Sequence, residues 1–269
     1  MSNIISIEPP AGMRVRFISD LHLGHERSEV PPMEDLTPLL DDIGMLVVVG
    51  DLAESRNSDW KNRALKLRDD FRRMCRERQV ELIEIAGNHD PDVPTLMARF
   101  WGGSVVAMHG HALFKEVAPW SWEYLRNRNR CRELIASYPH ADTDLEERLE
   151  LSRAVSLFTT PIMKRDENIS NKHLRGFLHC FWPPTRPVNI VRGWIECGAR
   201  AQSFAEQFFP EAKVLITGHF HRSGFWKYPR RTIINTGAWF THATPYVLDM
   251  RGGQILSYLR YNSHIGITY

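Results

Sequence analysis

Five short segments of the chain place carboxylate, amide or imidazole side chains directly after an apolar run. They read DLH at residues 20–22, GD at 50–51, GNHD at 87–90, HGH at 109–111 and GHFH at 218–221. One such segment alone is readily explained as a solvated turn, because Asp, Asn and Ser are ordinary turn residues. Five of them, each after an apolar run, indicate a shared chemical purpose instead.

The residue types in these segments suit divalent metal ions. Carboxylate, amide oxygen and imidazole ligands favour Mn, Fe, Zn or Mg, and none of the segments offers a thiolate. Two such ions about 4 Å apart can share a bridging carboxylate and a bridging hydroxide, which places the hydroxide in line with a phosphorus atom. Asp51 lies between the other ligands in chain order and is the natural bridge. The pattern therefore predicts a two-metal hydrolytic centre.

The elements that position these segments are predicted to be strands. Apolar runs at 13–19, 45–50, 80–87, 104–110 and 213–218 each lead to one of the five segments. Helices are predicted over 34–44, 57–79 and 92–100, the last with Asp92 as a candidate N-cap. Alternating strands and helices favour an α/β sheet, whose ligands bind at the carboxyl ends of the strands. We therefore expect the carboxyl ends of all five strands to lie on one edge of the sheet. The closely spaced apolar runs over 213–261 predict an antiparallel meander.

Residues 115–200 differ from the rest of the chain. They are rich in Arg, Trp and Leu, and helices are predicted over 121–138 and 144–165. We interpret this stretch as an inserted helical cap, and residues 1–114 and 201–269 as the core. The part at 172–200 is basic and aromatic, so it either meets an anionic lipid or membrane surface or packs its aromatic rings on the core. We expect the cap to select the substrate and to leave the metal centre alone.

The composition sets few further limits. The chain has 269 residues, 43% hydrophobic and 25% charged, with a net charge of +2, which gives no strong signal for nucleic-acid binding. Its four cysteines form no C-x-x-C pair. Neither a signal peptide nor an apolar run of about 20 residues is recognisable. We expect a cytoplasmic protein, with peripheral contact to the inner face of the membrane through the cap as an option.

In order and type, the five segments resemble the motifs of the calcineurin-like metallophosphoesterase family, which read D-x-H, G-D, G-N-H-D/E, H and G-H-x-H. The resemblance implies a four-layer α/β/β/α sandwich with the cap inserted. It also implies two divalent ions, Mn first and Fe, Zn or Mg as alternatives. One ion would be held by Asp20, His22, Asp51 and His221, and the other by Asp51, Asn88, His109 and His219.

The same resemblance implies roles for the neighbouring residues. His89 would lie beside the metals, where it binds a phosphoryl oxygen or protonates the leaving group, and Asp90 would orient it. Arg222 follows GHFH directly and is a candidate to bind the substrate. His111 in HGH is a second candidate to bind the substrate.

Several functions fit these residues. The first is hydrolysis of a phosphoester or pyrophosphate in a phosphorylated small molecule or lipid-linked substrate. The segments SDLHLGH and GHFHR, and a cap directly after HGH, are similar to the UDP-2,3-diacylglucosamine pyrophosphatases of lipid A synthesis. A nuclease and a non-catalytic scaffold, such as the retromer subunit with this fold, are the alternatives. The sequence leaves the natural substrate and the oligomeric state open.

Overall fold

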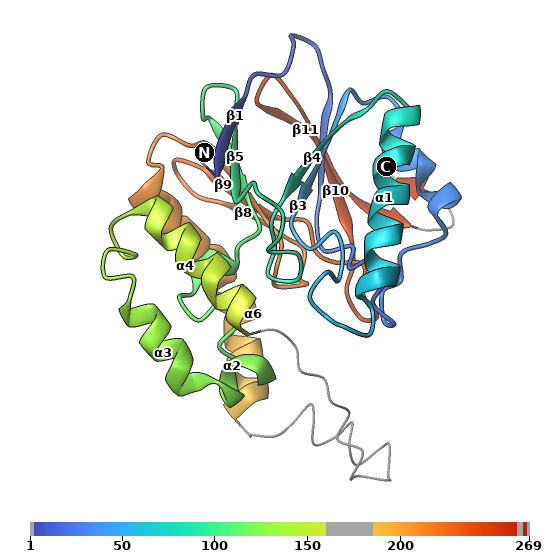
Figure 1. Ribbon diagram of the computed structural model, residues 1–269. Coiled ribbons are helices and arrows are strands. Elements are labelled where there is room, and N and C mark those ends of the chain that lie inside the picture. Colours follow the sequence, from blue (N-terminus) through green and yellow to red (C-terminus); the bar gives the residue numbers. More distant parts are fainter. Residues whose placement is uncertain (1–2, 160–184, 263–265, 268–269) are drawn as a thin grey trace.

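The computed structural model describes residues 3–159, 185–262 and 266–267, and its strands form two six-stranded sheets (Figure 1). Sheet I has the order β1 (Ile4–Ile7), β5 (Met97–Phe100), β6 (Val105–Met108), β7 (Val214–Thr217), β9 (Thr232–Asn235) and β8 (Gly224–Lys227). Sheet II has the order β12 (Gly266–Ile267), β11 (Gln254–Asn262), β10 (Tyr246–Arg251), β2 (Val15–Ile18), β3 (Met45–Val49) and β4 (Glu81–Ile85). Strands β2, β3 and β4 run parallel, as do β6, β7 and β9.

The two sheets pack face to face. Along a strand, successive side chains point alternately into the space between the sheets and toward the helices on the outer face. In β3, Val47 and Val49 belong to the cluster between the sheets, while Leu46 and Val48 belong to the cluster under the helices. Between the sheets, the rings of Phe17 and Phe100 meet edge to face at 5.3 Å. An apolar run with no polar alternation thus gives a strand covered on both faces.

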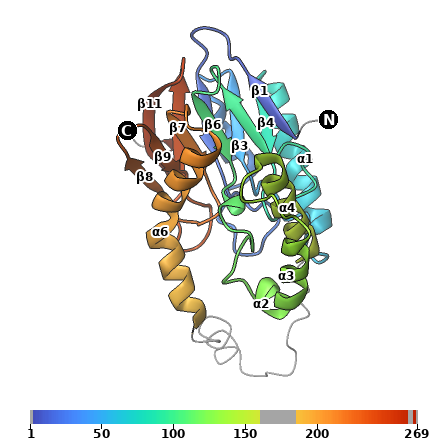
Figure 2. The ribbon, with the colours of Figure 1, turned by 90° about the vertical axis from the view of Figure 1, so that its left-hand side faces the viewer.

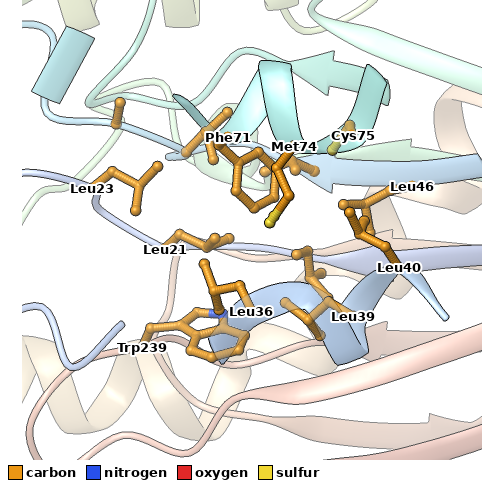
Figure 3. Packing of buried hydrophobic residues seen from close by; sticks show 14 of the residues in the cluster. Leu21, Leu23, Leu36, Leu39, Leu40, Leu46, Phe71, Met74, Cys75 and Trp239 are labelled. Atoms are coloured by element: carbon orange, nitrogen blue, oxygen red, sulfur yellow. The ribbon is translucent and has the colours of Figure 1, made fainter. Parts of the chain in front are cut away.

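Helices cover the outer face of each sheet, which confirms the α/β class and gives four layers. Helix η1 (Met33–Leu40) and helix α1 (Lys61–Glu77) lie on sheet II, where Leu36, Leu39 and Phe71 enter one apolar cluster (Figure 3). Full burial of a side chain of this size stabilises the fold by about 1.5–3 kcal/mol. The carboxyl-terminal half of α6 (Thr185–Phe208) packs on sheet I through Ala201 and Phe204.

The cap begins after η2 (His111–Leu113) and contains α2 (Trp122–Arg126), α3 (Arg128–Ala136) and α4 (Leu145–Phe158). The side chain of Asp144 accepts the amide of Glu147, which fixes the start of α4. Figure 2 shows that α6 runs from the cap into the core without a break, so it crosses the boundary predicted at residue 200. Residues 172–184 of the basic, aromatic stretch at 172–200, and residues 160–165 of the helix predicted over 144–165, lie outside the described residues.

The structure corrects three predictions about the elements. Residues 97–100 form strand β5 instead of the end of the predicted helix, because they pair with β1 and β6. The five ligand-bearing ends lie on two sheets, three on sheet II and two on sheet I. The late strands form no simple meander, since β7 and β9 are parallel in sheet I while β10 and β11 pair in sheet II. No helix of the described residues is long and apolar enough to cross a membrane.

Candidate metal centre

The two sheets bring their ligand-bearing loops together at one end of the sandwich. The loops after β2 and β3 are joined because the amide of His22 donates to Asp51 O at 2.9 Å. The loops after β6 and β7 are joined because the amide of Gly218 donates to His109 O at 2.9 Å. The sheets are joined in turn because the amide of His219 donates to the Asp20 carboxylate at 3.1 Å. Loops from four strands therefore meet at a single site.

The backbone of this site is unusual, because five predicted ligands have a positive φ angle. The angles lie between +49° and +74° for Asp20, His22, Asp51, His219 and His221. They are half of the ten non-glycine residues with positive φ in the described part of the chain. Such angles cost about 1–3 kcal/mol each and persist only where the surrounding structure imposes them. The strain is therefore concentrated where the ligands are.

Glycine is required beside two of the carboxylates because the backbone passes so close to them. A Cβ atom at Gly87 would lie 2.0 Å from Oδ1 of Asp51, and one at Gly218 would lie 2.2 Å from Oδ2 of Asp20. Real Cβ atoms do not approach other atoms this closely. The glycines of GNHD and GHFH therefore leave room for the carboxylates of the neighbouring loops.

The first predicted ligand group converges on one point. Ligand atoms of Asp20, His22, Asp51 and His221 all lie within 4.8 Å of one another. Nε2 of His22 is 3.1 Å from Nε2 of His221 and 3.7 Å from Oδ2 of Asp51. Nε2 of His221 is 3.4 Å from Oδ1 of Asp20. The carboxylates and His22 are fully buried, and His221 is partly exposed.

The second predicted group comes together through Asp51 and Asn88. Nε2 of His109 is 3.0 Å from Oδ2 of Asp51 and 3.3 Å from Oδ1 of Asn88. Nδ1 of His219 is 2.8 Å from the same Asn88 oxygen. The Asp51 carboxylate thus faces ligands of both groups, which is the position predicted for a bridge.

Two histidines are held from outside by backbone carbonyls, so that their second ring nitrogen faces the centre. Nδ1 of His109 donates to Val49 O at 2.8 Å, and Nε2 of His219 donates to Val117 O at 3.0 Å. Because carbonyl oxygens only accept, these nitrogens carry the protons, and in the neutral ring the other nitrogen keeps a lone pair. The residues present therefore fit divalent cations, which need converging lone pairs and oxygen ligands.

The carboxylates and histidines of the site shift one another's pKa values. Burial alone would raise the pKa of the Asp51 carboxyl, but the attraction of His109 outweighs it and holds the pKa well below its ordinary value. Burial alone would lower the pKa of His22, but hydrogen bonds to carboxylates raise it to about 10. The pKa of His109 is raised to about 9 by Asp51 and Asp20 against the effect of burial. For His219 burial prevails and lowers the pKa to about 3, so this ring is neutral at pH 7.

Glu54 is a buried carboxylate of the site that was not predicted from the sequence. Oε1 of Glu54 lies 2.8 Å from Nδ1 of His22, and Oε2 lies 2.9 Å from Nδ1 of His89. One carboxylate thus orients a candidate ligand and the candidate proton donor. The three residues also form a second group of potential metal ligands. Four residues separate Glu54 from the end of β3, and no family motif quoted above includes it.

Asp90 was predicted to orient His89, but its carboxylate oxygens accept hydrogen bonds from backbone amides instead. Its oxygens accept the amides of Asp51 at 3.1 Å, Leu52 at 2.7 Å and Gly87 at 2.7 Å. Asp90 therefore holds the backbone of the GD and GNHD segments together, and the carboxylate that orients His89 is that of Glu54. The catalytic role of His89 stays a prediction.

The two candidate substrate-binding residues lie in different surroundings. Arg222 is exposed, and its Nη1 donates to Trp194 O at 3.1 Å. His111 is buried, and its Nδ1 has no hydrogen-bond partner among the described residues. Arg56 was not predicted, although its Nη1 donates to Asn88 O while Nε and Nη2 find no partner in the described part of the chain. Arg56 and His111 are thus the polar side chains beside the centre with unused hydrogen-bonding atoms.

Several solved structures are similar to this chain at low sequence identity. Among solved structures, a predicted phosphoesterase from Streptococcus pneumoniae is 10% identical, with 95% of this chain and 92% of that chain covered and a TM-score of 0.42. Vps29 from Chaetomium thermophilum is 11% identical, with 97% and 94% covered and a TM-score of 0.43. A cold-active protein-tyrosine phosphatase from a psychrophilic Shewanella species is 13% identical, with 100% and 82% covered and a TM-score of 0.44.

Comparison with curated proteins gives no match. The family described as calcineurin-like phosphoesterase matches residues 13–223, which include every predicted ligand from Asp20 to His221. The match covers most of the chain, from before β2 to the end of the GHFH segment. The chain therefore belongs to the calcineurin-like phosphoesterase family.

Proposed function

We propose that this protein is a metal-dependent hydrolase that cleaves a phosphoester or pyrophosphate bond with two divalent cations. The observation that carries the proposal is that members of both predicted ligand groups, His22 and His109, approach the carboxylate of Asp51. Bound there, such ions polarise a phosphoryl group and lower the pKa of a water molecule. Manganese is the first candidate, because carboxylate, amide and imidazole ligands suit it.

His89 supplies the proton in this proposal. Burial alone would lower its pKa, but Glu54 and Asp51 attract the charged ring and raise the pKa above its ordinary value. With Nδ1 paired to Glu54, the Nε2–H of the ring is free to protonate a leaving oxygen or to hold a phosphoryl oxygen. The ring is partly exposed, as a group that meets substrate must be.

Arg56 and His111 support the binding of an anionic substrate. The unused guanidinium nitrogens of Arg56 match the oxygens of a phosphoryl group, which accept paired N–H donors. We propose Arg56 as a substrate-binding residue in addition to His111. Arg222 is a weaker candidate, because its guanidinium is engaged with Trp194.

A narrower candidate is a lipid-linked pyrophosphate of the UDP-2,3-diacylglucosamine type. The observation that favours it is a pair of exposed apolar side chains on the cap half of α6, namely Val188 and Val191. They lie on the helix that contacts the GHFH segment, so an apolar tail could rest there while its phosphates reach the centre. This surface also supports peripheral contact with a membrane.

Metal-reconstituted protein tests the proposal. We expect about two Mn ions per chain by elemental analysis, and hydrolysis of at least one substrate among artificial monoesters, diesters and nucleotide-diphospho-sugars. Full metal loading without turnover of any of these substrates would instead favour a non-catalytic scaffold. Turnover of a nucleic acid alone would show a nuclease.

A further inference from the structure

The cap contacts the GHFH segment at two separate places, so the metal centre is not independent of it. Val117, near the start of the cap, accepts the ring N–H of His219. Trp194, in the cap half of α6, donates its indole N–H to the carbonyl of Phe220 at 3.0 Å. Phe220 lies between the two candidate ligands His219 and His221. The cap was expected to leave the metal centre alone, and these two hydrogen bonds contradict that expectation.

The first contact depends on a strained residue. Val117 has a φ of +65°, which is rare for a β-branched side chain, and it is almost fully buried. Its side chain packs in a cluster with Ala141, Leu151 and Val155, all of which belong to the cap. The packing of the cap thus determines where the carbonyl of Val117 points, and this carbonyl fixes which nitrogen of His219 keeps its lone pair.

The second contact is reciprocal. Arg222 returns a hydrogen bond from Nη1 to the carbonyl of Trp194 at 3.1 Å, so one residue of α6 both donates to the segment and accepts from it. Trp194 is 41% exposed, which is high for a tryptophan that serves only to fill a core. Its position is set by the core, because Ala201 and Phe204 anchor the same helix on sheet I.

We propose that Trp194 is a positioning residue of the metal centre. Together with the carbonyl of Val117, its indole N–H holds residues 219–221 in the conformation in which both histidines face the ligands. The positive φ angles of His219 and His221 need such restraint from outside. The proposal rests on the proposed metal centre, but it concerns the conformation of the segment and not the reaction.

Trp194→Phe is the sharpest test, because it keeps an aromatic ring and removes the donor. The matched control is Ile195→Ala, which changes the neighbouring, highly exposed side chain of the same helix. We expect Trp194→Phe to bind Mn about 2- to 10-fold more weakly by calorimetry, the range that one hydrogen bond allows. Ile195→Ala should bind as the wild type does, and thermal melts should show that both variants fold.

A second measurement needs no metal. In the metal-free protein, amide hydrogen exchange at residues 219–222 should be faster in Trp194→Phe and in Arg222→Met than in the wild type and in Ile195→Ala. Unchanged exchange and unchanged Mn affinity in Trp194→Phe would overturn the proposal. Equal losses in Trp194→Phe and Ile195→Ala would also overturn it, because general helix packing would then be the cause. If the wild type binds no metal, the proposed function fails, while the exchange data still decide the role of Trp194.

Discussion

At the scale of single residues, the centre depends on the two ring nitrogens of each histidine. One nitrogen makes a hydrogen bond that holds the ring in place, and the other faces the candidate metal site. Glu54 is the clearest case, since its two oxygens reach the Nδ1 atoms of His22 and His89. Burial alone would raise the pKa of Glu54, but the attraction of His89 and the hydrogen bond of His22 hold it well below its ordinary value. The carboxylate therefore stays charged wherever the protein is folded near neutral pH.

Glu54→Gln should weaken metal binding and turnover together. An amide of the same shape removes the charge that keeps His22 and His89 oriented, and loss of such a supporting group typically costs about 10–100-fold in metal affinity or activity. Calorimetric titration with Mn and steady-state kinetics give the two numbers. Glu54→Asp is the matched control, because it keeps the carboxylate charge but shortens the side chain by one methylene group. Full Mn affinity in Glu54→Gln would mean that its hydrogen bond to His22 is not required for ligation.

His89→Ala should separate binding from turnover. The ring is assigned to proton transfer or phosphate binding, so the variant should keep its metals and lose about 10²–10⁴-fold in kcat. The loss should be smaller for a nitrophenolate leaving group, which needs little protonation. A variant that cleaves an alkyl phosphoester at the normal rate would remove His89 from the mechanism.

Metal binding should release protons and strengthen as the pH rises. Without metal, the pKa of His22 is about 10 and that of His109 about 9, so both rings carry a proton at pH 7 that a cation must displace. The affinity for Mn should therefore increase from pH 7 toward pH 9. Calorimetry at pH 7 in buffers of different ionisation enthalpy counts the protons released, and a count of zero would contradict these pKa values.

At the scale of elements, most of the site followed from strand ends, because an apolar run followed by a polar residue is a local signal. The strands before Asp20, Asp51, Asn88, His109 and His219 were all placed correctly. Which strands share a sheet is not local, so the division of the ends between two sheets could not be predicted. The same holds for β5, whose strand form depends on pairing with β1 and β6.

The supporting residues were missed for a related reason. Glu54 lies in a loop, and Val117 supports His219 with a carbonyl that every residue type has. Arg56 is recognisable only by guanidinium nitrogens that are buried without a partner among the described residues. A sequence pattern shows the side chains that ligate, but contacts made across loops appear only in the folded chain.

Gly87→Ala should damage the centre although glycine is not a ligand. The added Cβ would meet the carboxylate and the amide of Asp51 at 2.0 and 2.5 Å, so either Asp51 or the GNHD segment must move. We expect loss of stoichiometric Mn binding by elemental analysis. Gly102→Ala is the control, because a Cβ there meets nothing within 4 Å and only its positive φ is strained. Normal Mn stoichiometry in Gly87→Ala would show that the loop adapts.

A buried ion pair joins two strands of sheet II, and its arginine also connects this sheet to η1. Arg16 on β2 makes two hydrogen bonds to Asp249 on β10, at 2.7 and 2.8 Å, and also donates to the Leu39 carbonyl. Arg16→Met should lower the free energy of unfolding by about 3–5 kcal/mol, because Asp249 is left buried without its main partner. Denaturant unfolding measures this, and Arg14→Met, which removes a contact at 3.9 Å, should cost much less.

At the scale of the whole molecule, the cap and the core act as one unit around the GHFH segment. Helix α6 has 24 residues, about 36 Å, and spans both parts. Replacing residues 115–200 by a short Gly/Ser linker removes Val117 and Trp194 together. We therefore expect a well-folded deletion to bind Mn more weakly than the wild type, as measured by calorimetry after a melt has shown cooperative unfolding. Unchanged Mn affinity would mean that the core alone holds the ligands.

The strand order of both sheets also has a consequence for synthesis on the ribosome. In sheet II, Phe17 on β2 pairs with Leu248 on β10, and in sheet I, Val106 on β6 pairs with Leu215 on β7. Neither sheet is complete until strands from far along the chain have emerged, and pairing over such separations is slow. A partly made chain therefore presents the apolar faces of β2, β3 and β4 without the second sheet to cover them. Chaperones that hold nascent chains should meet this protein early, and the metal centre can assemble only after β7 has left the ribosome.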